Sequence, residues 1–163
     1  MRKPVFLTRI NQTFMVVAAF WALLLAVNIA LDVFGRVVFN SPVLGTTEAV
    51  TNSIVMIAFL QLPYAVFSRS MLRADFLLSV LPGRLSRIFT FIGACLGAAL
   101  FGLLVYGIFD PMLTAYARGE FVGEGTVRIP VWPIYVVILT GAALTTLNYL
   151  IEAAMLLIDD GEV

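Results

Sequence analysis

Four long apolar stretches restrict the folds open to this chain more than any other feature of its sequence. They occupy residues 14–31, 49–67, 88–109 and 131–158. Each has about the 20 apolar residues that a helix needs to cross the hydrocarbon core of a bilayer. Hydrophobic residues make up 61% of the sequence and charged residues only 12%, whereas a soluble domain has about 25% charged residues. The sequence therefore predicts an all-α integral membrane protein.

The predicted architecture is a single four-helix membrane domain over residues 1–163, with transmembrane helices at about 12–39, 47–68, 86–110 and 130–158. A basic segment precedes the first helix, and a basic segment also precedes the apolar region of a signal peptide. That helix is longer than the ~7–15-residue apolar region of a signal peptide, and no small-residue cleavage site follows it. We expect it to be an uncleaved membrane anchor.

The segment between the second and third helices has a pattern of its own. Apolar residues recur there at helical spacing, at Leu72, Phe76, Leu77, Val80 and Leu81. This spacing predicts a short amphipathic helix at about 71–81 that lies in the inner membrane interface. The alternative is a connecting loop whose leucines pack against the ends of the neighbouring helices.

Lysine and arginine are distributed unevenly between the two sides of the predicted helices. One side carries seven, at Arg2, Lys3, Arg9, Arg69, Arg73, Arg84 and Arg87. The other side carries three, at Arg36, Arg118 and Arg128. Because cytoplasmic loops are enriched in lysine and arginine, both termini are predicted to be cytoplasmic, with two loops outside.

The composition excludes several classes of protein. The sequence has no histidine and a single cysteine, Cys95. It therefore lacks histidine ligands for haem or zinc and the cysteine pair of a thiol–disulfide oxidoreductase. Its formal net charge is zero, so it has no basic footprint for nucleic acid. Since no phosphate loop, nucleophile elbow or metal-ligand spacing is present, we expect neither an enzyme nor a bound cofactor.

The first predicted helix carries three polar residues on one face. Asn28, Asp32 and Arg36 follow one another at intervals of four, which places them on the same side of a helix. Asp32 precedes Arg36, the favourable order for an ion pair, and charges at membrane depth are costly unless paired. We favour a structural ion pair that orients this helix; the alternative is a proton or ion pathway.

Polar residues in the second and fourth helices are candidates for interhelical hydrogen bonds. Glu48 and Asn52 lie near the start of the second helix, and Asn148 and Glu152 near the inner end of the fourth. Such a bond contributes about 1 kcal/mol in lipid. Glu48 and Glu152 are expected near opposite membrane faces, so we do not expect them to share an ion site.

Other residues predict local features of the helices. Gly93 and Gly97 form a GxxxG pattern, which lets a second helix approach closely. Thr46 or Thr47 is expected to cap the second helix. Two more predictions are a kink at Pro63 and a place for Trp132 in the outer aromatic belt.

Two short segments resemble one family of membrane proteins. The first is Asp32-Val-Phe-Gly-Arg36-Val-Val-Phe39-Asn40, followed by Glu48, and the second is Ile129-Pro130-Val131-Trp132-Pro133-Ile-Tyr135. The order of these two segments along a chain with four predicted helices resembles the small membrane subunit of tripartite ATP-independent periplasmic (TRAP) transporters.

The resemblance implies a non-catalytic role in a three-part importer of the bacterial inner membrane. Its partners would be a large membrane subunit, which holds the sodium and substrate sites, a periplasmic binding protein that captures an organic acid, and membrane lipids. The small subunit would brace the large one and help dock the binding protein.

Two other interpretations remain open from the residues alone. One is a self-contained, homo-oligomeric antiporter of small solutes or protons. The small multidrug antiporters of that kind have an essential glutamate in the middle of their first helix, and the first helix here has none. The other is a membrane anchor for an unrelated complex.

Overall fold

The computed structural model describes residues 5–41, 43, 45–68, 83–123 and 128–158. Its elements are, in chain order, α1 (Val5–Phe39), α2 (Thr46–Phe67), α4 (Gly83–Arg118), β1 (Phe121–Val122), β2 (Ile129–Pro130) and α5 (Trp132–Ile158). The amphipathic helix predicted at 71–81 lies outside the described residues, so it stays a prediction.

Within the described part of the chain, four helices are long and apolar enough to cross a membrane. The predicted all-α fold with four spans is therefore confirmed. α1 has 35 residues. At ~1.5 Å per residue it is longer than the ~30 Å hydrocarbon core of a bilayer, so it must tilt or extend beyond that core.

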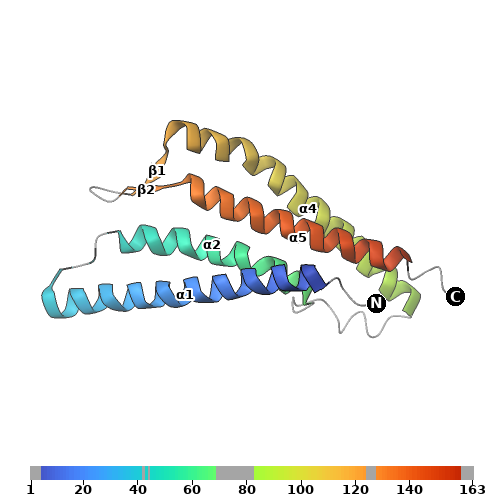
Figure 1. The fold of residues 1–163 in the computed structure, drawn as a ribbon, viewed down its shortest axis with the longest axis horizontal. Coiled ribbons are helices and arrows are strands. Elements are labelled where there is room, and N and C mark those ends of the chain that lie inside the picture. The colour runs from blue at the N-terminus through green and yellow to red at the C-terminus, as the bar shows by residue number, and fades with distance from the viewer. Residues whose placement is uncertain (1–4, 42, 44, 69–82, 124–127, 159–163) are drawn as a thin grey trace.

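The helices pack in the spatial order α1, α2, α5, α4. α1 and α2 are antiparallel, as are α4 and α5, whereas α2 and α5 run in the same direction (Figure 1). The start of α1 and the end of α5 therefore lie at the same end of the molecule, which we call the terminal end. The bend between α1 and α2 and the β1–β2 hairpin lie at the opposite end, which we call the hairpin end.

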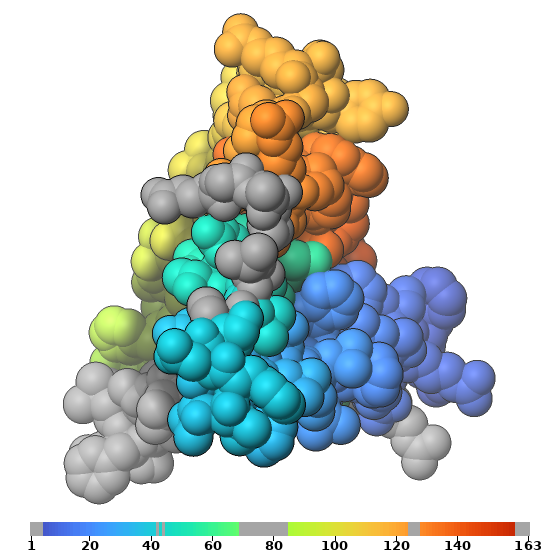
Figure 2. Space-filling model, turned by 90° about the vertical axis from the view of Figure 1, so that its left-hand side faces the viewer, coloured from blue at the N-terminus to red at the C-terminus, as the bar shows by residue number. Residues whose placement is uncertain are grey.

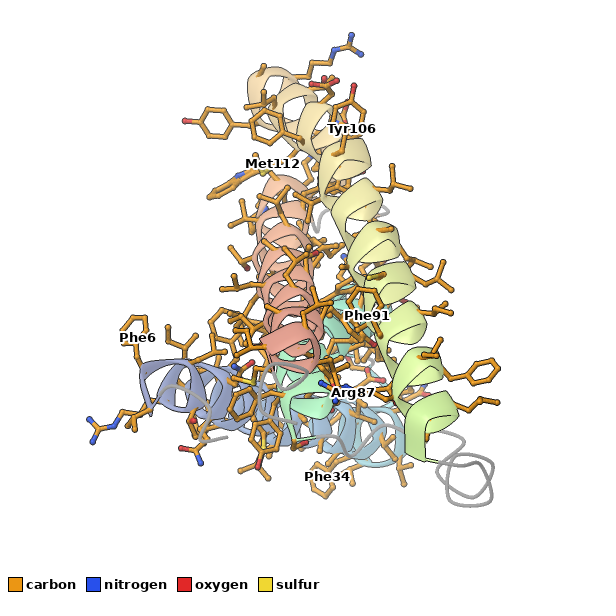
Figure 3. The ribbon with its side chains drawn as sticks, turned by 90° about the vertical axis from the view of Figure 1, so that its right-hand side faces the viewer. Phe6, Phe34, Arg87, Phe91, Tyr106 and Met112 are labelled. Atoms are coloured by element: carbon orange, nitrogen blue, oxygen red, sulfur yellow. The ribbon has the colours of Figure 1, made fainter. Side chains whose placement is uncertain are left out.

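Alanine forms much of the contact between the helices, and bulky apolar side chains point outward. Ala18 and Ala142 are fully buried. Phe6, Phe34 and Tyr106 point away from the helices (Figure 3) and are 75%, 56% and 81% exposed. Large exposed apolar surfaces mark interaction sites or contact with a membrane, and lipid is the environment that a spanning helix requires on its outer face.

Two helices are longer than the sequence predicts. α1 begins at Val5 rather than near residue 12, and α4 continues to Arg118 rather than ending near residue 110. Pro111 removes one backbone donor from α4, but tertiary contacts hold the turns that follow. The Tyr116 ring packs edge-on against the Trp132 ring, with 5.7 Å between the ring centroids.

The end of α4 leads directly into a short hairpin. Gly119 has a positive φ of 62°, its N–H donates to the carbonyl of Tyr116, and the N–H of Glu120 donates to the carbonyl of Ala115. This is the Schellman pattern of helix termination. β1 and β2 then pair antiparallel, with Phe121 opposite Pro130.

The expectation that Thr46 or Thr47 caps α2 is wrong. Gly45 occupies the capping position with a φ of 85°, and no side chain there accepts a hydrogen bond from the first turn. The Thr46 hydroxyl instead donates to the carbonyl of Val43 at 3.0 Å, so this side chain is bonded to the preceding bend.

Candidate functional site

Asp32 and Arg36 form an ion pair at the hairpin end of α1. The Arg36 guanidinium lies 2.7 Å from the Asp32 carboxylate, whose side chain is 7% exposed, whereas that of Arg36 is 58% exposed. The other carboxylate oxygen of Asp32 accepts a hydrogen bond from the backbone N–H of Val43, at 2.8 Å. The buried side chain of Asp32 therefore bonds both to its own helix and to the bend that leads to α2.

The residues around this pair shape the same bend. Asn40 adopts a positive φ of 49°, and the N–H of Ser41 donates to the carbonyl of Gly35 at 3.2 Å. A Cβ atom on Gly35 would lie 2.8 Å from the carbonyl oxygen of Ser41, so a larger residue would push the bend away from α1.

We call these residues the α1–α2 clasp: Asp32, Gly35, Arg36, Asn40, Ser41 and Val43. The clasp contains most of the chemically distinctive residues of the segment 32–40. Within the clasp, Asp32 bonds to Arg36 and to the backbone N–H of Val43, and the carbonyl of Gly35 accepts the N–H of Ser41.

The remaining polar residues predicted near the hairpin end stay outside the clasp. Asn28 shares a face with Asp32 but is only half-buried, and its Oδ1 atom has no hydrogen-bond partner among the described residues. The Nδ2 atom of Asn52, on α2, is likewise buried without a partner in the part of the chain that the structure describes. Glu48 is half-buried and takes no part in the bonds of the clasp.

A second polar site lies towards the terminal end, where α1, α2 and α5 meet. The side-chain amides of Asn11 and Asn148 exchange two hydrogen bonds, at 2.8 and 3.3 Å. Asn148 also donates to the carbonyl of Pro63 on α2 at 3.0 Å, and Asn11 to the carbonyl of Leu7 at 2.8 Å. We call these four residues the asparagine network.

The asparagine network is fully enclosed by the three helices. Asn11 is 0% exposed and Asn148 is 5% exposed. A buried amide is costly unless its donors and acceptors are bonded, and here the two amides satisfy each other. The prediction that Asn148 bonds between helices is borne out by these contacts.

Just beside this network, α2 and α5 approach each other very closely. Pro63 has no N–H, so it cannot bond to the carbonyl of Phe59 one turn earlier. A Cβ atom on Gly141 of α5 would lie 2.2 Å from that same carbonyl oxygen. The proline and the glycine therefore act together: one frees the carbonyl and the other leaves room for it.

Glu152 lies one turn beyond Asn148 and is 5% exposed. It borders a small pocket at the terminal end, whose other lining residues are Leu7, Val66, Phe67, Asn148, Ile151 and Met155. Among the described residues, no three acidic or cysteine side chains gather where they could hold a metal ion.

The two glycines of the predicted GxxxG pattern have different surroundings. A Cβ atom on Gly97 would lie 2.8 Å from the ring of Tyr149, which stacks on Phe101 with 6.1 Å between the ring centroids. A Cβ atom on Gly93 would meet nothing within 4 Å. Only Gly97 makes the predicted close contact, and its partner is a side chain of α5.

Aromatic residues gather at the hairpin end, where Trp132 was expected to mark an outer belt. Trp132 is 39% exposed and contacts Tyr116. Arg128 lies over the ring of Phe121, 4.6 Å from its centroid. This grouping suits a polar–apolar boundary, where aromatic rings and cationic side chains are favoured together.

The sequence-based predictions do not include Asn11 or Gly141, nor Leu7, Ser41 and Val43, and they name Arg87 only as one of the basic residues on one side. The Arg87 guanidinium donates to the carbonyl of Leu156 in the last turn of α5. Asn11, Ala18 and Asp32 are buried on α1 at spacings that are multiples of seven; the spacing can be read from the sequence, but the burial comes from the structure. Figure 3 shows Arg87 extending from α4 towards α5.

A family model from known proteins matches most of the chain. The family, described as "Tripartite ATP-independent periplasmic transporters, DctQ component", matches residues 25–158. The matched range contains the α1–α2 clasp, Pro63, Gly141 and Asn148, whereas Asn11 lies before it. No curated protein matches the chain.

Proposed function

The chain belongs to the DctQ family, the small membrane subunits of TRAP transporters, and from this premise we propose that it is the non-catalytic brace of a sodium-driven organic-acid importer. Its partners in this proposal are a large membrane subunit, which carries the sodium and substrate sites, and a periplasmic binding protein. We further propose that it lies in a bacterial inner membrane with both termini in the cytoplasm.

The observation that carries the proposal is the bonding of Asp32. One carboxylate oxygen faces Arg36 and the other accepts the N–H of Val43. A carboxylate that carries protons or ions must exchange partners during each transport cycle. Asp32 is instead committed to a charge on its own helix and to the backbone of the adjoining bend, which favours a structural role over a carrier role.

The asparagine network supports the same conclusion. Asn11 and Asn148 use their amide groups to join α1, α2 and α5. Interhelical hydrogen bonds of this kind stabilise one arrangement of membrane helices. A subunit with fixed helices suits a brace, against which the moving part of a large subunit can shift.

Co-purification tests the proposal directly. A tagged chain, expressed in its native membrane and extracted in mild detergent, should bring down a large membrane protein in constant ratio. Proteoliposomes that contain both proteins should take up an organic acid only with a sodium gradient and the binding protein. A chain that purifies alone, and that transports solute alone in proteoliposomes, would contradict the brace and establish the homo-oligomeric antiporter.

A further inference from the structure

The last turns of α4 expose two chemically different sectors. The bulky apolar residues exposed here recur at intervals of three, four and three, which places them within about 80° of one another around a helix. They are Tyr106, Phe109, Leu113 and Tyr116, which we call the α4 anchor face. The other exposed residues from 106 to 118 form a separate, polar sector, made up of Gly107, Asp110, Pro111, Thr114, Ala117 and Arg118.

The polar sector marks the level at which α4 leaves the hydrocarbon on that side. Nearer the terminal end, the same side of the helix exposes Leu100 and Leu103, which are 59% and 71% exposed. Asp110 and Thr114 follow on this side. Because an exposed carboxylate is costly in hydrocarbon, the membrane boundary on this side of α4 lies between Leu103 and Asp110.

The α4 anchor face stays apolar for almost two more turns. Leu113 and Tyr116 come after Asp110 in the chain, yet they are bulky and are 49% and 69% exposed. A helix that crossed the membrane at a right angle would become polar at one level on all sides. α4 becomes polar on one side first, which is typical of an amphipathic segment that lies obliquely in the interface.

The shape of α4 permits this course. The helix is curved rather than straight (Figure 1) and contains Pro111, a residue that bends helices. Atoms of this part of the chain lie at one extremity of the molecule, away from α1 and α2 (Figure 2). Among the described helices, only α5 makes extensive contact with α4, so the α4 anchor face is open to its surroundings.

The contact between Tyr116 and Trp132 fixes the depth of the α4 anchor face. Their ring centroids are 5.7 Å apart, and Trp132 is the first residue of α5, a helix long and apolar enough to cross a membrane. Tyrosine and tryptophan favour the membrane–water interface, because one end of each side chain is polar. The face therefore continues the lipid-facing surface of α4 and ends where α5 begins.

We propose that the α4 anchor face is embedded in the headgroup layer of the leaflet at the hairpin end, where phospholipids cover its rings and the polar sector faces water. The last turns of α4 then act as an interfacial anchor, which holds the β1–β2 hairpin at the membrane surface. This inference does not depend on the proposed function, because it concerns contact with lipid alone.

A nitroxide label tests which sector faces lipid. Cys95→Ser removes the single cysteine of the chain, and Leu113→Cys or, as the matched control, Thr114→Cys then provides the site for the label. The chain, with the membrane proteins that purify with it, is placed in vesicles of phosphatidylethanolamine and phosphatidylglycerol. Collision with oxygen relative to a water-soluble nickel chelate should be at least threefold more frequent at residue 113 than at residue 114.

Two results of this experiment would overturn the proposal. Equal ratios at the two positions would mean that both sides of α4 leave the hydrocarbon at one level. A label at residue 113 that neither oxygen nor the nickel chelate reaches would mean that protein, rather than lipid, covers the α4 anchor face.

Fluorescence of Trp132 provides a second measurement. Trp21→Phe leaves Trp132 as the single tryptophan, and lipids brominated just below the headgroup should quench it at least twofold more than lipids brominated near the chain ends. Leu113→Asp should reduce this quenching at least twofold, whereas Thr114→Asp should leave it unchanged. The amount of inserted chain is measured in parallel. Equal quenching in the Leu113→Asp and Thr114→Asp chains would contradict the anchor.

Discussion

Asn11 and Asn148 are 137 residues apart in the sequence, yet each side-chain amide is donor and acceptor to the other. The pair joins the first helix of the chain to the last, and Asn148 extends the link to α2 through Pro63. This reciprocal contact accounts for two otherwise costly amides in the interior. Each asparagine side chain therefore needs the other to satisfy its hydrogen-bonding groups in the interior.

The first prediction concerns this dependence. Asn148→Ala should lower the free energy of unfolding in detergent by about 1–3 kcal/mol, because it leaves the buried amide of Asn11 without its partner. Asn11→Ala should have a similar effect, and the double variant should cost less than the sum of the two. Thermal unfolding of the purified subunit measures all three.

Thr140 on the same helix provides the matched control. Its side chain is exposed, and among the described residues its hydroxyl bonds only to carbonyls of its own helix, so Thr140→Ala should change stability by less than about 0.5 kcal/mol. Strictly additive effects of the two asparagine substitutions would show that the amides do not interact.

A second prediction follows from the close approach of α2 and α5. Gly141→Ala should destabilise the subunit by about 1–3 kcal/mol, as overpacking does in other interiors, because the added methyl group would collide with the carbonyl of Phe59. Gly93→Ala is the control. It adds the same methyl group where nothing lies within 4 Å, and alanine is favoured over glycine in helices by about 1 kcal/mol.

The comparison of these two variants is made by thermal unfolding under identical conditions. Gly93→Ala should unfold at the same temperature as the unmodified chain or slightly higher, and Gly141→Ala clearly lower. Equal stability of the two variants would mean that α2 and α5 are not in contact at Gly141.

The sequence predicts those features of the fold that depend on neighbouring residues. The four membrane-spanning helices follow from the four apolar stretches, although α1 begins at Val5 rather than near residue 12. The Asp32–Arg36 pair follows from a separation of four residues. The bounds of α4 could not be predicted in the same way. Pro111 indicates a break, but contacts with α5, such as that of Tyr116 with Trp132, hold the helix together beyond it.

The asparagine network shows where prediction from the sequence ends. Asn148 was a candidate for an interhelical bond, but nothing in its own neighbourhood indicates that Asn11 is the partner. That choice depends on the order in which the helices pack. Likewise, the GxxxG pattern predicts a close contact on α4 but does not say that Gly97 meets Tyr149 while Gly93 stays open.

The third prediction concerns orientation in the membrane. The excess of lysine and arginine on one side predicts that both termini lie in the cytoplasm. Alkaline phosphatase, which folds only outside the cytoplasm, should be active when fused after Asn40 or Arg118, and inactive when fused after Arg84. The ends of α1 and α4 both lie at the hairpin end of the molecule (Figure 1), so the first two fusions must agree. Activity only after Arg84 would reverse the orientation.

The fourth prediction ranks substitutions in the α1–α2 clasp. Asp32→Ala should impair assembly most, because it removes both the partner of Arg36 and the acceptor for the N–H of Val43. Asp32→Asn keeps an oxygen for that N–H and should be milder. Arg36→Ala should also impair assembly, because it leaves the Asp32 carboxylate, whose side chain is only 7% exposed, without its charged partner.

The same variants distinguish a brace from a carrier. If Asp32 is structural, transport should fall only in proportion to the amount of assembled complex, and Asp32→Ala combined with Arg36→Ala should be milder than the sum, because no unpaired charge is left behind. A proton carrier would behave differently, since it needs a carboxylate that titrates. In that case Asp32→Asn alone would abolish transport while the complex stayed assembled, and neutralising Arg36 would not restore it. That result would revive the antiporter interpretation, because a brace held by two hydrogen-bonded oxygens has no step that requires the carboxylate to take up a proton.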